Sequence, residues 1–193
     1  MKQVENSPTI QKLSAYLEEF YGQKHDSYRL ILSLFLHSGG FNSEMINSNG
    51  QKEVYAVVGP NCEIDFLPVF DKNFIETDIV LHEFGNPITD KYERKINDLK
   101  EKYYTVELQK TGKENGYEEW KDVFNELILR ATTIKITEKY FGKAQAKKNL
   151  DWEISEGFGL VESILKILDE YEQNRNLYPT FDKFFPVLLE RMK

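Results

Sequence analysis

Two adjacent residues near the middle of the chain, His82 and Glu83, are of the types that bind a metal ion and accept a proton. They begin the pattern His-Glu-x-x-His, in which two imidazoles one helical turn apart bind zinc and the Glu lies beside the metal-bound water. The fifth position is Asn86, and Pro87, which follows it, biases Asn86 away from helical geometry. The motif therefore indicates metal-assisted hydrolysis, while its missing second His argues against that reaction.

A second charged pair, Glu126 and Arg130, lies inside a segment that is otherwise apolar nearly all round. Such a segment is typical of a buried helix. A buried carboxylate costs several kcal/mol unless it is paired or bound to a metal. One interpretation is an ion pair one turn apart, which contributes about 0.2–0.5 kcal/mol when exposed. The other makes Glu126 a third zinc ligand from a second helix, and the residues alone leave both open.

The elements that must position these residues are a small sheet and a set of helices. A first helix is expected from Pro8, with Ser7 as its N-cap, to the break at Gly22. Strands are expected within 28–58, where Asn49-Gly50 is a strong hairpin signal. The fold class predicted is α+β, with a small antiparallel sheet at about 28–58, a mostly helical remainder, and one domain over residues 1–193.

The helical remainder is predicted from the spacing of its apolar residues and from its breaks. Thr77 or Asp78 is expected to begin the helix that carries His82. Apolar residues on one stripe predict a long helix over 118–141, ended by Gly142. The other predicted segments are a charged helix after Pro87 to about 104, a polar loop at 109–117, an amphipathic helix at 160–171, and an aromatic segment at 181–192.

Composition limits the classes of partner. The formal charge of −7, with scattered Lys and Arg, predicts no nucleic acid binding, and no run approaches the ~20 apolar residues of a membrane helix. Cys62 is the only cysteine, which excludes an internal disulfide and a thiolate zinc cluster. The first residues lack an apolar signal core, so we expect a cytoplasmic protein or an exported one whose signal has been removed.

Several blocks, in order, resemble a bacterial domain-of-unknown-function family whose members look like zincin metallopeptidases of the gluzincin-like type and are usually exported. The resemblance covers most of the chain. The matching blocks are Tyr28 to Phe41 with its Gly-Gly-Phe segment, Val54 to Pro60, Leu81 to Phe84 with Asn86-Pro87, Asn125-Glu126 with Arg130-Ala131, and Tyr171 to Phe185.

The chain departs from this family at the metal-binding block. The family pattern runs approximately His-Glu-Phe-(Ser/Gly)-His-Ser-Phe-Val-Asn-Pro, so about four residues, including the second His, are missing after Phe84. Four residues are close to one helical turn, and the helix can absorb the deletion by becoming shorter. His37 and Asn86 are the alternatives considered as substitute ligands; a structural or substrate-side role suits His37 better.

The resemblance implies a zincin-like fold and a zinc-dependent peptidase. His82 and Glu126 would be metal ligands, and Glu83 would be the general base for water that attacks a peptide bond. The cofactor is then zinc, bound weakly or not at all without a third ligand, and the partner is a peptide or protein substrate. The alternative function is a catalytically inactive pseudo-peptidase that binds a peptide or protein, and a plain helical scaffold is a third.

Two geometric expectations follow from this mapping. His82 and Glu126 should lie within about 10 Å of each other, since zinc–ligand bonds are only about 2.0–2.2 Å long. Arg130 should pair with a carboxylate or a backbone carbonyl near the site.

Overall fold

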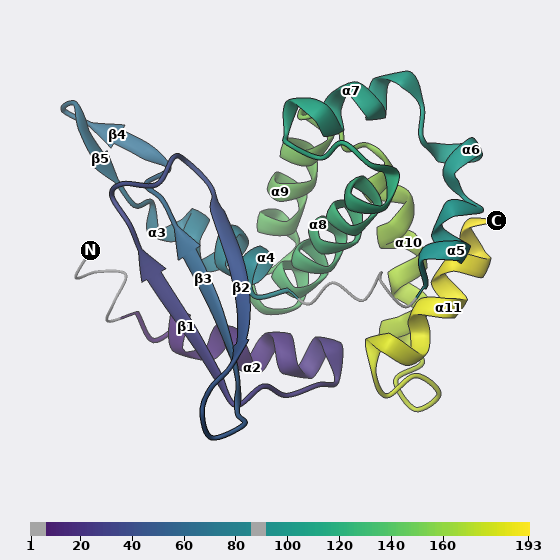
Figure 1. Ribbon diagram of the computed structural model, residues 1–193, viewed down its shortest axis with the longest axis horizontal. Helices are drawn as coiled ribbons and strands as arrows, with labels where there is room; N and C mark the ends of the chain where they lie inside the picture. The colour runs from purple at the N-terminus through teal and green to yellow at the C-terminus, as the bar shows by residue number, and fades with distance from the viewer. Residues whose placement is uncertain (1–6, 86–91) are drawn as a thin grey trace. The chain divides into compact units, whose positions relative to one another are not determined.

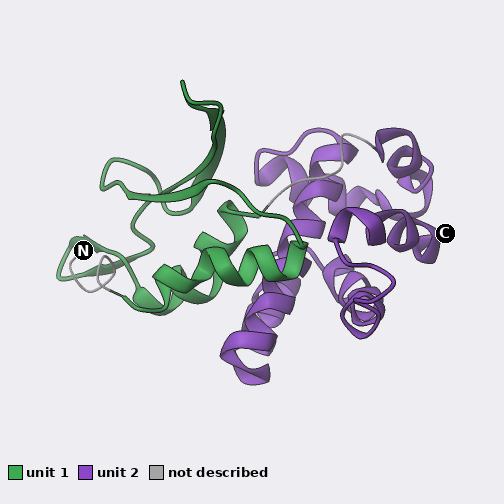
Figure 2. Ribbon diagram, turned by 90° about the horizontal axis from the view of Figure 1, so that it is seen from below, with its two compact units in different colours: residues 1–85 green, residues 86–193 purple. Residues whose placement is uncertain are grey.

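The computed structural model describes residues 7–85 and 92–193, and the chain divides into two compact units (Figure 2). The first unit is Met1–Gly85 and the second is Asn86–Lys193. The first holds the strands and the second is helical, so the α+β class is confirmed (Figure 1). The single zincin-like domain over 1–193 stays a prediction.

The sheet of the N-terminal unit has three strands, β1 (Ser27–Leu32), β2 (Gly40–Ile46) and β3 (Lys52–Val58). Their order is β1-β3-β2, so β3 is central and β2 is an edge strand. β2 pairs antiparallel with β3, but β1 pairs parallel with it. The predicted antiparallel sheet is therefore wrong in part, and the sheet is mixed. After β1, residues 33–39 lead to β2, which lies at the other edge of the sheet. The chain then turns back through the β2–β3 hairpin, so that β3 lies between β2 and β1.

The two faces of the sheet differ because successive side chains alternate. We call the face with Val54, Ala56 and Val58 of β3 the inner face, and these three side chains are buried. Helix α4 (Val80–Glu83) packs against β3 and β2, and helix α2 (Ile10–Tyr21) packs against α4. The outer face carries Tyr55 and Val57, which are only half-buried.

Helix α2 begins close to its predicted place and ends at the predicted glycine. Thr9 is its N-cap, and the Thr9 N–H donates to the Ser7 hydroxyl at 3.2 Å. Gly22 closes the helix in the left-handed conformation, with φ 67°, which a residue with a side chain rarely adopts. Leu13 and Leu17 are fully buried or nearly so, and they anchor the helix in the core of this unit.

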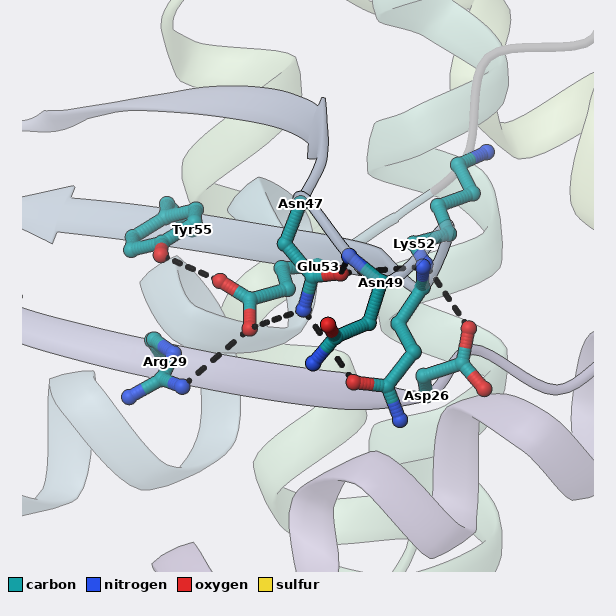
Figure 3. Close-up of polar contacts among 8 residues, drawn as sticks. Asp26, Arg29, Asn47, Asn49, Lys52, Glu53 and Tyr55 are labelled. Carbon is teal, nitrogen blue, oxygen red and sulfur yellow. Dashed lines mark hydrogen bonds and ion pairs between the residues drawn. The ribbon is translucent and has the colours of Figure 1, made fainter.

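The β2–β3 hairpin is built where Asn49-Gly50 predicts it. The Asn47 side-chain oxygen accepts from the Asn49 N–H at 2.9 Å and the Gln51 N–H at 3.1 Å. Figure 3 shows how Glu53 joins this turn to the outer face, accepting from Asn47 Nδ2 at 3.2 Å and from Tyr55 Oη at 2.5 Å. Arg29 of β1 donates to the same carboxylate at 3.2 Å. These three bonds, that from Tyr55 most strongly, lower the pKa of Glu53.

A second, two-stranded hairpin follows the sheet, formed by β4 (Cys62–Ile64) and β5 (Leu67–Val69). Its two turn residues, Asp65 and Phe66, both have positive φ, at 51° and 62°. Two-residue hairpin turns favour positive φ because the twist then matches that of the strands, although Gly and Asn adopt it more readily than Phe.

The C-terminal unit is a helical cluster around α8 (Trp120–Phe141), which is largely buried along its length. Its other helices, among the described residues, are α5 (Glu93–Asn97), α6 (Lys100–Tyr103), α7 (Val106–Glu114), α9 (Lys143–Ser155), α10 (Leu160–Gln173) and α11 (Phe181–Met192). α8 packs against α5, α9 and α10, and α10 packs against α11. The aromatic core includes Trp120, Phe124 and Tyr171, all at most 2% exposed.

The long helix and the amphipathic helix fall where their apolar stripes predict them, and the aromatic segment forms α11 over Phe181–Met192. The predicted polar loop at 109–117 is wrong, because most of it lies in α7. Thr105 caps that helix by accepting from the Leu108 N–H at 3.2 Å. α7 buries only Leu108 and Gly112, so its sequence has too few apolar residues to show a helical stripe. No helix in the described ranges is both long and apolar enough to cross a membrane.

The close approach of Gly59 to the connection at 33–39 gives a first prediction. A Cβ at Gly59 would lie 2.0 Å from the backbone oxygen of His37, which cannot move away as a side chain could. We expect Gly59→Ala to lower the free energy of unfolding by about 3 kcal/mol or more. Urea unfolding would measure this, with Ser48→Ala in the exposed turn as a control expected to stay within about 0.5 kcal/mol. A loss below about 1 kcal/mol for Gly59→Ala would contradict this packing.

Candidate functional site

His82 and Glu83 lie at the end of one continuous helical run. It consists of α3 (Lys72–Phe74), a π-helical stretch η1 (Ile75–Ile79) and α4. The run begins earlier than Thr77 or Asp78, because Asp71 is the N-cap and its side chain accepts from the Phe74 N–H at 2.8 Å. The expectation that Thr77 or Asp78 begins this helix is therefore wrong.

The π-helical stretch changes which residues face the core. A π turn holds more residues than an α turn, and such turns recur at functional sites. Ile75 and Ile79 are buried, and after the wide turn Glu83 is more buried than His82. Glu83 is 6% exposed and His82 is half-buried. Both side chains have partners within the structure.

The carboxylate of Glu83 lies against the first residue of the edge strand. A Cβ built on Gly40 would be 2.9 Å from both Cγ and Oε1 of Glu83. This contact lies on the inner face of β2, where α4 packs. Tyr28 of β1 packs its ring edge-on against Phe84, with 5.2 Å between ring centroids, and so helps to hold the end of the helix. The arrangement places an acidic group beside an open strand edge.

The loop that leads into the edge strand is held by backbone contacts. The Gly59 N–H donates to the Gly39 carbonyl at 2.9 Å, and Gly59 leaves room for the backbone of His37. The Nδ1 of His37 lies 2.8 Å from the Ser38 carbonyl. A carbonyl can only accept, so this bond places the proton of the neutral ring on Nδ1 and leaves Nε2 as an acceptor. His37 is exposed, and its Nε2 can act as an acceptor toward a ligand.

The open edge of β2 has a defined set of backbone groups. The Asn47 N–H bonds to the Gln51 carbonyl, and the Gly59 N–H bonds to the Gly39 carbonyl. In an antiparallel pair, bonded and non-bonded residues alternate, so the odd-numbered residues of β2 point their backbone groups at β3. Backbone groups of the even-numbered residues, Gly40 to Ile46, therefore point away from β3. Among the described residues, β3 is the strand that pairs with β2 in the three-stranded sheet, so these groups are left for another strand.

Glu126 lies in the C-terminal unit, in a buried network of three charged side chains. Arg130 forms an ion pair with Glu126, 2.8 Å away and one turn earlier on α8, and donates a hydrogen bond to Glu153 of α9. The side chains of Glu126 and Glu153 are 5% and 7% exposed. The Arg130 guanidinium also lies 4.0 Å from the ring centroid of Phe158, a favourable cation–π distance. The expectation that Arg130 pairs with a carboxylate is thus confirmed, and so is the ion pair with Glu126.

The charges of this network stabilise one another. Burial by itself would lower the pKa of Arg130, but Glu126 and Glu153 outweigh it and raise the pKa. Arg130 therefore remains a cation, and one guanidinium serves two carboxylates. The sequence interpretation did not identify Glu153 as a member of this charged network. The sequence gives no bounds for a helix that carries Glu153, so it does not align Glu153 with Arg130.

The sequence-predicted site residues fall into two groups. His82 and Glu83 lie in the N-terminal unit and Glu126 lies in the C-terminal unit. The expected proximity of His82 and Glu126 stays a prediction, as does the role of each as a metal ligand and of Glu83 as a base. Asn86, one alternative ligand, lies outside the described residues.

A catalytic zinc ion needs three protein ligands and an open position. Over the described residues of either unit, no three His, Cys, Asp or Glu side chains form a group that could hold a metal ion. The carboxylate of Glu126 is already bound to Arg130, and position 86 offers an amide in place of an imidazole.

The fold and the site define an α+β chain with an acidic group beside an open strand edge. The family model described as "Domain of unknown function (DUF4932)" matches residues 3–191, and the chain belongs to that family. No curated protein and no solved structure matches the chain. The zincin relationship remains a resemblance that these comparisons do not test.

The buried network in the C-terminal unit gives a second prediction. Arg130→Leu would leave Glu126 and Glu153 buried without their shared cation, and we expect it to lower the free energy of unfolding by about 3–5 kcal/mol. Urea unfolding measures the change. Lys147→Ala is the matched control, because its pair with Asp151 is exposed and contributes about 0.5 kcal/mol or less. A loss for Arg130→Leu as small as that of the control would mean that the network is not desolvated.

Proposed function

We propose that this chain is a degenerate member of a peptidase lineage that binds an extended peptide, or an extended segment of a protein, along the open edge of β2. The observation that carries the proposal is the position of Glu83 at the first residue of that edge, against Gly40. A peptide that adds a strand to a sheet edge gains its affinity from main-chain hydrogen bonds and its specificity from alternate side chains. β2 offers both, because the backbone groups of its even-numbered residues point away from β3 and six of its seven residues are exposed.

The geometry of the loop at 37–40 supports the same function. An edge strand whose backbone is already fixed binds a peptide more tightly, since ordering a loop on binding lowers affinity. Gly59 holds this loop through the bond to Gly39, and Gly40 holds the strand against α4. The backbone of the β2 edge is therefore fixed before a partner strand binds.

Binding without hydrolysis is favoured by the donor set. The His-Glu pair lacks its second His, and Glu126 is neutralised by Arg130. Two protein ligands make a weak zinc site, so the chain is proposed as a pseudo-peptidase.

A zinc-dependent peptidase is the second candidate, and the burial of Glu83 beside the edge strand is what favours it. A general base must lie within hydrogen-bond reach of the attacking water, and an edge-bound peptide would run close to this carboxylate. His82 and Glu126 would then be the ligands, with His37 or Asn86 completing the set. In that case the chain would act on peptide bonds with Glu83 as the base.

Zinc content separates these two functions. We expect the purified protein, equilibrated with zinc and then desalted, to hold far less than one zinc per chain by elemental mass spectrometry. The physical reason is that only His82 and Glu126 carry over as ligands. One zinc per chain that is lost in His82→Ala and retained in His25→Ala would instead support the peptidase, and cleavage abolished by Glu83→Gln would establish it.

The edge of β2 is tested by a proline substitution. Asn42→Pro removes one outward N–H, whereas the ladder to β3 stays intact because Asn42 does not point its backbone groups at β3. We expect peptides selected from a random library on the wild-type protein to bind Asn42→Pro at least about tenfold more weakly, since a backbone bond is lost and its partner is left unpaired. Binding would be measured by fluorescence anisotropy.

Asn42→Ala is the control for this substitution, because it removes the side chain and keeps the N–H. It should bind the selected peptides as the wild type does. Equal binding by Asn42→Pro, or a library that yields no binder, would contradict edge binding.

A further inference from the structure

The outer side of the β2 edge is apolar. Phe41 and Met45 point to the outer face and are 50% and 52% exposed. Phe41 is in register with Val57, and Val57 with Ile31, so an apolar row crosses the whole sheet at this end. Ile31 is itself 45% exposed. A strand added to β2 would extend this row with its own side chains.

The inner side of the same edge is acidic. Gly40, Asn42 and Glu44 point inward, and Glu83 lies against Gly40. Glu44 pairs with Lys52 at 2.8 Å, but both side chains are about 40% exposed, and such a pair is weak and replaceable. Two carboxylates thus lie on the inner side of β2. One is Glu44, and the other is Glu83, which lies beside Gly40, four residues before Glu44.

The N-terminal unit as a whole is acidic, like the inner side of the β2 edge. Residues 1–85 hold six Lys and Arg against twelve Asp and Glu, a formal charge of −6 out of −7 for the chain. A field of this sign attracts cationic segments and repels anionic surfaces.

We propose that the segment bound at β2 is an extended basic peptide with alternating character. Its residues on the outer side are apolar and extend the row that contains Phe41 and Met45, and its residues on the inner side are Lys or Arg that face the exposed Glu44. This inference rests on the proposed edge binding and names the chemical class of the ligand. The two sides of a strand alternate residue by residue, so the pattern is apolar, basic, apolar, basic.

Other occupants of the edge fit less well. A second copy of this chain would bring another unit of charge −6 and another Glu44 to the same edge. A membrane with anionic lipids would meet the same repulsion. A basic segment of another protein, or of a peptide, is the occupant whose charge complements the edge.

Three synthetic peptides of equal length test the pattern on the wild-type protein. One alternates Val and Lys, one has the same composition with the Val and Lys residues in two blocks, and one alternates Val and Glu. We expect the alternating Val-Lys peptide to bind at least about tenfold more tightly than either of the others, by fluorescence anisotropy at low salt. Equal binding of the two Val-Lys peptides would overturn the alternation, and equal binding of the Val-Glu peptide would overturn the charge preference.

Variants of the protein test whether Phe41, Met45 and Glu44 cause the preference for the alternating Val-Lys peptide. Phe41→Ser and Met45→Ser should weaken the alternating Val-Lys peptide, and Glu44→Gln should reduce its advantage over the Val-Glu peptide. Ile64→Ser is the control, because Ile64 is a similarly exposed apolar residue of β4, outside the three-stranded sheet. Loss of binding in the control to the same extent would overturn the assignment, as would self-association through β2 detected by light scattering and abolished by Asn42→Pro.

Different results would overturn the proposed edge binding and the proposed class of ligand. Library-selected peptides that depend on Asn42 and show no alternating basic pattern would overturn this inference and leave edge binding in place. The absence of any peptide that binds, from the library or from the three defined sequences, would overturn both.

Discussion

The contact between Glu83 and Gly40 is the constraint on which the arrangement of the N-terminal unit depends. A carboxylate that is 6% exposed lies where a side chain on the edge strand would otherwise be. Only a residue without a Cβ permits this approach, so Gly40 sets how closely α4 packs against β2. The same approach positions the acidic group at the strand edge, and the proposed function follows from that position.

Two further glycines keep this geometry fixed. Gly59 allows the backbone of His37 to pass within a distance that no other residue would tolerate, and its N–H binds Gly39. The loop before β2 is therefore held by backbone contacts and leaves its side chains, His37 among them, available. The C-terminal unit is stabilised differently, by an aromatic core and by the buried network around Arg130. That network explains why a carboxylate at position 126 is compatible with a buried helix whether or not a metal binds.

The sequence predicts those parts of the fold that depend on local signals. The stripe that includes Phe124 and Leu127 predicts α8, and Asn49-Gly50 predicts the β2–β3 turn, since both signals lie within the element concerned. The parallel pairing of β1 with β3 is different, because it depends on where the hairpin folds back and not on the residues of either strand. Helix α7 is missed because a short surface helix needs few apolar residues.

The same distinction applies to the candidate site. His82, Glu83 and Glu126 are found from their types and spacing, and the Arg130–Glu126 pair from its one-turn separation. Glu153 and Gly40 are not, because their partners are 23 and 43 positions away and only the folded chain brings them together. The π-helical stretch is also unpredicted, and it decides that Glu83 is the more buried of the His-Glu pair.

Hydrogen exchange of the β2 amides tests peptide binding at this edge most directly. The N–H groups of Asn42 and Glu44 point away from β3 and should exchange rapidly in the free protein, whereas those of Phe41 and Ser43 are protected by the ladder. With the alternating Val-Lys peptide bound, Asn42 and Glu44 should become protected while Phe41 and Ser43 change little. Protection that appears elsewhere and leaves Asn42 and Glu44 exchanging rapidly would contradict binding along β2.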